Sequence, residues 1–63
     1  MKTSVKTNIK GNENLFVKES VETIYEKLTD KHGFILLTLV SHDLKENRVG
    51  IKKTAIQLFK AAL

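Results

Sequence analysis

The 63-residue chain contains no cysteine. This absence excludes disulfide bonds and metal sites built on thiolates, two common reinforcements of small proteins. A domain of about 60 residues buries only about 60% of the surface that its unfolded chain exposes, so its hydrophobic core is marginal. Oligomerisation is the other common remedy. The composition therefore favours a chain that associates with further copies of itself, a dimer first of all.

Long apolar runs are also absent. The longest, Phe34 to Val40, has seven residues, whereas a membrane-spanning helix needs about 18 or more. The first ten residues alternate polar and apolar side chains and lack the continuous apolar stretch of a signal peptide. We therefore expect a soluble protein of the cytoplasm without a membrane partner.

Arginine is scarce, since Arg48 is the only one among eleven basic residues. Arginine is favoured for forked contacts to guanine and phosphate. The net charge of +4 rests on lysine and is opposed by seven acidic residues. Charge alone therefore favours solubility over nucleic-acid recognition.

Period-two alternation predicts the strands. Thr3 to Ile9 alternates strictly, and Lys10 to Asn14 has the composition of a turn. Leu15 to Val17 then forms a short partner strand. Phe34 to Val40 is apolar at both odd and even positions apart from one threonine, as in a strand that is covered on both faces of the sheet. Arg48 to Lys52 resumes alternation and completes a second hairpin.

Two segments have helical spacing. Val21, Ile24, Tyr25 and Leu28 form one stripe, with Ser20 as N-cap, which predicts a helix from about Ser20 to Asp30. Thr54 and Gln57 have the spacing of a capping box, which predicts a second helix from about Ala55. The side chains expected to cover the sheet are Ile24, Tyr25, Leu28, Leu58 and Phe59.

These elements predict one α+β domain over residues 1–63, ordered β-β-α-β-β-α. Both helices pack on one face of an antiparallel or mixed sheet. At an offset of 34 residues the two halves align, for example Leu15 with Val49 and Ser20 with Thr54. We interpret the chain as two strand-strand-helix units and treat 3–30 and 37–63 as a possible internal repeat. Similar strand-to-helix junctions would produce the same pattern without duplication.

Ser41, His42 and Asp43 are the three residue types of a hydrolytic triad, but they are adjacent. Successive side chains of an extended segment point to opposite faces, so the serine and histidine would not meet. A turn role for Ser41 and Asp43 is the better interpretation. The sequence therefore predicts no catalytic residues and no enzyme activity.

Metal and phosphate sites lack support as well. His32 and His42 fall in separate loops without a short ligand spacing. The three glycines stand far apart and form no phosphate-binding loop. We expect no metal site, no cofactor and no small-molecule substrate.

The sheet face turned away from the predicted helices is the candidate contact surface. Its large apolar side chains are Phe16, Leu36 and Val40, with Phe34 as a further candidate. Its basic side chains are Lys2, Lys6, Lys10, Arg48 and Lys52. The apolar set predicts self-association about a two-fold axis. The alternative is a nucleic-acid-binding surface with Phe16 as a stacking platform. Aliphatic side chains suit protein contact better, so the sequence favours self-association.

A third hypothesis is a heteromeric adaptor that receives a partner strand at an exposed sheet edge. The lysines of the first strand would oppose uncontrolled pairing there.

The stretch "GNENLFVKESVETIYEKL", Gly11 to Leu28, resembles the turn, strand and helix start of the small flagellar FlbD-like proteins. It covers less than a third of the chain and implies no catalytic position. The lysine-rich, proline-free composition resembles that of small accessory proteins of low-GC bacteria.

Overall fold

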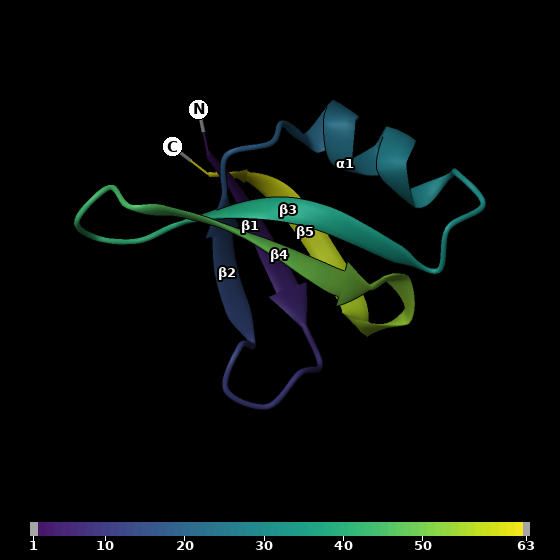
Figure 1. Cartoon of the computed structure of the whole chain (residues 1–63), viewed down its shortest axis with the longest axis horizontal. Helices are drawn as coiled ribbons and strands as arrows, with labels where there is room; N and C mark the ends of the chain where they lie inside the picture. Colours follow the sequence, from purple (N-terminus) through teal and green to yellow (C-terminus); the bar gives the residue numbers. More distant parts are fainter. Residues whose placement is uncertain (1, 63) are drawn as a thin grey trace.

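The protein is a curled five-stranded antiparallel sheet with one short helix, seen in a computed structural model that describes residues 2–62. The elements are β1 (Lys2–Thr7), β2 (Asn14–Val17), α1 (Val21–Leu28), β3 (Phe34–Val40), β4 (Glu46–Lys52), the 3-10 turn η1 (Lys53–Ala55) and β5 (Ile56–Ala62). The strand order is β4-β3-β2-β1-β5. Figure 1 shows β3 and β4 crossing in front of β1 and β5, with α1 along one end. The predicted β-β-α-β-β-α order with two helices is therefore wrong.

Both predicted hairpins form. β1 pairs with β2 from Thr3 opposite Val17 to Lys6 opposite Asn14. Gly11 has φ +87 in the connecting turn, a conformation that glycine adopts without steric cost. β3 and β4 pair along their whole length, from Phe34 opposite Lys52 to Val40 opposite Glu46.

The first predicted helix is confirmed. Ser20 is its N-cap, and its hydroxyl oxygen accepts a hydrogen bond from the backbone N–H of Thr23. The helix packs against β3 and β5, and only Ile24 is fully buried. Tyr25 is 64% exposed, so its predicted burial is wrong. Eight residues turn too little surface towards the sheet to bury the whole stripe.

The second predicted helix does not form. One 3-10 turn at Lys53–Ala55 leads into β5, which pairs antiparallel with β1, for example Phe59 opposite Val5. A helix here would leave the backbone groups along that edge of β1 without partners, so pairing outweighs the local helical spacing. Leu58 is consequently 54% exposed, not buried as predicted.

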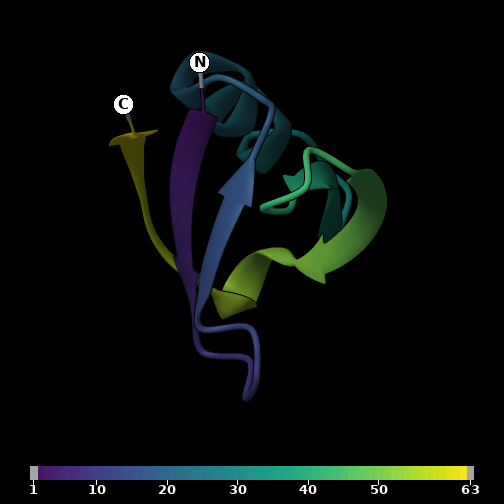
Figure 2. The same ribbon diagram turned by 90° about the vertical axis from the view of Figure 1, so that its left-hand side faces the viewer.

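The core fills the concave side of the sheet. Its fully buried apolar residues come from four strands, the helix and η1: Val5, Val17, Ile24, Ile35, Leu37, Ile51 and Ala55. The sheet face opposite the predicted contact surface is thus the core face. The backbone N–H of Asn8 donates to the Ala55 carbonyl at 2.9 Å, which ties the β1 end to η1. Figure 2 shows the resulting curl, with β5, β1 and β2 side by side and β3 and β4 turned across them.

The internal repeat stays a prediction. In the first half, Val21–Leu28 forms the helix α1. The residues that align with it at the offset of 34, 55–62, form the end of η1 and the strand β5. The predicted repeat ends at Leu63, which lies outside the described residues.

Across residues 2–62, no helix is long and apolar enough to cross a membrane.

Candidate functional site

The outer face of the sheet, opposite the core, is strongly basic. We define it by the alternating residues that point away from the core. Its charged members are Lys2, Lys6, Lys18, Glu46, Arg48, Lys52 and Lys60. Six cations and one carboxylate give these alternating positions a net charge of +5, and the Glu19 carboxylate lies beside them, hydrogen-bonded to the outward-pointing Thr38. The other five cations and six carboxylates of the chain give −1 elsewhere, so the excess positive charge is gathered on one face.

Four of the five basic residues predicted for this face lie on it, two on β1 (Lys2, Lys6) and two on β4 (Arg48, Lys52). Lys10 is exposed in the turn after β1. The sequence alone does not place Lys18 and Lys60 on this face. Lys60 falls in the second predicted helix, and only its pairing opposite Ser4 of β1 puts it on the outer face.

The predicted apolar trio is not one cluster. The single β2–β3 register pair, Val17 opposite Leu39, places Phe16 beside Val40. Leu36 lies four residues further along β3, about 13 Å away at the usual rise per residue. Leu36 instead lies beside Phe34 over Gly50, where an added Cβ would stand 3.6 Å from Leu36 Cδ2 and 3.7 Å from Phe34 Cδ2.

Two exposed aromatic rings therefore occupy different parts of the outer face. Phe16 is 49% exposed and Phe34 is 53% exposed, whereas most phenylalanine side chains are buried. Phe34 also lies near the ring of His32, with centroids 6.3 Å apart.

Each ring lines its own shallow hollow. The first hollow, of about 440 Å³, is lined by Lys2, Asn14, Phe16, Val40, Ser41, His42 and Ala62. The second, of about 240 Å³, is lined by Lys27, Asp30, His32, Phe34, Ile35 and Leu36. Each hollow thus combines an aromatic ring with a lysine and a histidine.

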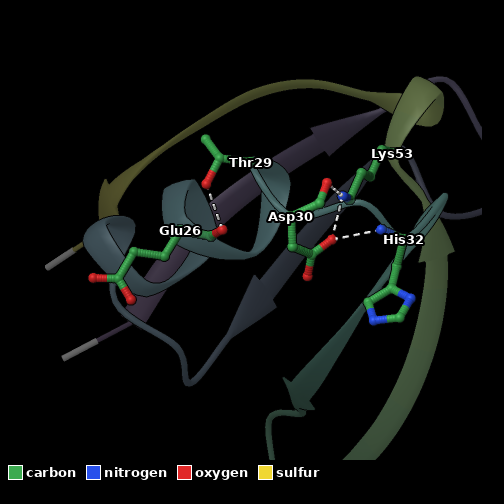
Figure 3. Close-up of polar contacts among 5 residues, drawn as sticks. All are labelled: Glu26, Thr29, Asp30, His32 and Lys53. Carbon is green, nitrogen blue, oxygen red and sulfur yellow. Dashed lines mark hydrogen bonds and ion pairs between the residues drawn. The ribbon is translucent and has the colours of Figure 1, made fainter.

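The carboxylate in the second hollow is paired. Lys53 Nζ donates to Asp30 Oδ1 at 2.6 Å and to the Asp30 carbonyl at 2.8 Å, and the His32 backbone N–H donates to the same carboxylate (Figure 3). The hydrogen bond from Lys53 is the main reason why the pKa of Asp30 lies below its ordinary value. The His32 ring points away from this network in Figure 3.

The Glu19 side chain links the segment after β2 to β3. β2 ends at Val17, and beyond it the Glu19 carboxylate accepts hydrogen bonds from Thr38, through the backbone N–H at 2.9 Å and the hydroxyl at 2.8 Å. The carboxylate thus replaces the backbone acceptor that a longer β2 would supply. Partial burial raises the pKa of Glu19, but the hydrogen bonds from Thr38 outweigh burial and hold it below its ordinary value.

We expect Glu19→Gln to weaken the response of stability to acid. A carboxyl group whose pKa is lower in the folded than in the unfolded state stabilises the fold at pH values above its unfolded-state pKa. This stabilisation is lost as the pH falls through the pKa of the folded state. The wild type should therefore lose stability progressively below about pH 4.5. Glu19→Gln should start about 1 kcal/mol less stable at pH 7, because a neutral acceptor replaces a charged one, and should lose less on acidification.

Urea unfolding at pH 7 and pH 3 measures this difference. Glu13→Gln, at an exposed position of the turn before β2, is the matched control and should behave as the wild type. An equal acid response in Glu19→Gln and the wild type would contradict the role of this carboxylate.

Ser41, His42 and Asp43 lie in the β3–β4 turn. The Ser41 hydroxyl hydrogen-bonds to the Asp43 carboxylate, and the Ser41 backbone N–H donates to the Lys45 carbonyl at 3.1 Å. The predicted turn role of Ser41 and Asp43 is confirmed. Within residues 2–62, no three histidine or acidic side chains lie close enough to hold a metal ion.

Comparison of the chain with protein-family models, with curated proteins and with solved structures gives no match. The resemblance of Gly11 to Leu28 to the FlbD-like proteins therefore rests on those residues alone and carries no argument about function.

Proposed function

We propose that the outer face binds single-stranded nucleic acid without enzymatic chemistry. The observation that carries this proposal is the net charge of +5 on the one face that also exposes Phe16 and Phe34. Lysines attract phosphates as point charges, and aromatic rings on a sheet stack on unpaired bases. The sequence places Phe16 on this face and offers Phe34 only as a further candidate, and the exposure of Phe34 supports a second stacking ring.

A single strand suits this surface better than a duplex. Bases in a duplex stack on one another and offer no free ring face, whereas the bases of a single strand are open to aromatic side chains. Phe16 and Phe34 lie in separate hollows, so each has room for its own base. Lys2 in the first hollow and Lys27 in the second place a cation beside each ring.

Self-association through Phe16, Leu36 and Val40 stays a prediction, and the charge pattern weighs against it. A two-fold contact would bring two faces of net charge +5 together. Leu36 also lies about 13 Å along β3 from Val40, so the trio offers no single apolar centre. A location in the cytoplasm likewise stays a prediction.

The test is a titration with labelled oligonucleotides at low salt, comparing single and double strands. Phe16→Ala and Phe34→Ala should each weaken single-strand binding by about 1–3 kcal/mol, roughly 5- to 150-fold in Kd. Tyr25→Ala is the matched control, because Tyr25 is an exposed aromatic residue on α1, outside both hollows.

Tyr25→Ala should bind as the wild type does. A loss in Tyr25→Ala equal to that in the two phenylalanine variants would contradict the proposal, as would tighter binding of duplex than of single strand.

A further inference from the structure

The outer edge of β5 has no partner strand within residues 2–62. β5 is last in the strand order and pairs on one side with β1, and Figure 2 shows no other element of residues 2–62 beside its outer edge. Its seven residues extend for about 23 Å. Half of the backbone N–H and C=O groups of such a strand point outward and can pair with another strand.

This edge has few of the usual protections. β4, at the opposite edge, carries Glu46, Arg48 and Lys52, which discourage pairing. β5 contains neither proline nor an acidic residue, and Lys60 is its only charge. The register shift of β5 against β1 is confined to its first residues, and pairing is regular from Leu58 to Ala62. β5 therefore presents a long, regular and nearly neutral edge.

We propose that two copies of this chain join antiparallel through β5, edge to edge about a two-fold axis centred on Phe59. In this register Lys60 of each copy lies opposite Leu58 of the other, so no like charges face each other. The methylene stem of each lysine covers the leucine, which is 54% exposed in the single chain. The two Phe59 rings meet on the opposite side, as a cross-strand aromatic pair. The strand is therefore complementary to itself.

The dimer would extend the outer face. Both sheets become one, and the Lys6 and Lys60 side chains of both copies lie near its centre on the same side. The joined sheet would offer a larger basic surface to nucleic acid. The pairing itself, however, depends only on the β5 edge and not on nucleic-acid binding. Loss of nucleic-acid binding in a variant that still dimerises would leave the pairing intact.

Sedimentation of the full chain over a range of concentrations tests the pairing. The wild type should approach twice the monomer mass as concentration rises to millimolar. Leu58→Lys places a like charge opposite the partner's Lys60 and should stay monomeric, while its exposed site lets it fold, as circular dichroism will show. Leu36→Lys, at the centre of the face predicted for self-association, should dimerise as the wild type does.

A cysteine pair gives a second readout. The chain has no cysteine of its own, so Leu58→Cys combined with Lys60→Cys can cross-link only through the introduced thiols. Opposed residues of paired strands lie within disulfide reach, and mild oxidation should give a covalent dimer. A wild type that stays monomeric at millimolar concentration would overturn the proposal. So would a dimer that Leu36→Lys abolishes and Leu58→Lys preserves.

Discussion

Leu37→Ala should lower the free energy of unfolding by about 2–5 kcal/mol, a large part of the stability of a domain this small. Leu37 lies in the middle of β3 and is 1% exposed, packed in the core cluster on the concave side of the sheet. Its removal leaves a cavity that the surrounding strands, tied to one another by backbone hydrogen bonds, fill only in part. Urea unfolding followed by circular dichroism measures the loss.

Leu58→Ala is the matched control. The helical spacing of the sequence predicts that Leu58 is a core residue, whereas the structure places it half exposed on β5. Its truncation should change stability by no more than about 0.5 kcal/mol, as at most surface sites. If Leu58→Ala were as costly as Leu37→Ala, the C-terminal segment would pack as a helix and the described sheet would be wrong.

Lys6→Glu combined with Lys60→Glu should lower the affinity for single-stranded oligonucleotides at least tenfold at low salt. The two lysines are diagonal neighbours on β1 and β5 of the outer face, and their reversal replaces attraction for phosphate by repulsion. Two lost phosphate contacts should also reduce the slope of log affinity against log salt by about 1.4. Fluorescence anisotropy at several salt concentrations measures both quantities.

Lys31→Glu combined with Lys45→Glu makes the same change in net charge. Both lysines are exposed in loops and line neither hollow. This control should keep most of the affinity and the slope of the wild type. Equal losses in the two double variants would show that binding follows net charge alone and does not use the outer face.

Local patterns in the sequence predict a large part of the fold. Alternation identifies β1 and β4, a continuous apolar run identifies β3, and Ser20 with the stripe through Ile24 identifies α1. These elements follow from short-range chemistry: side-chain alternation, turn residues and capping. The final strand, β5, does not follow from short-range chemistry. Ile56–Ala62 has helical spacing and forms a strand because it pairs with the backbone groups along the edge of β1.

The candidate site depends on the same long-range pairing. Lys2, Lys6 and Phe16 can be placed on the outer face from alternation alone. Lys60 reaches it only through the β1–β5 register, and the separation of Leu36 from Phe16 follows only from the β2–β3 register. The role of Glu19 is also invisible locally, since its partner Thr38 is 19 residues away.

The most direct test of the proposed function is to map the surface that a short single-stranded oligonucleotide touches, by amide chemical shifts of the labelled protein at low salt. The outer face should respond, with the largest changes at Lys2, Phe16, Phe34 and Val40 around the two hollows. The first turn of α1, Val21–Ile24, should not respond. Unchanged spectra, or changes centred on that first turn of α1, would contradict binding of nucleic acid by the outer face.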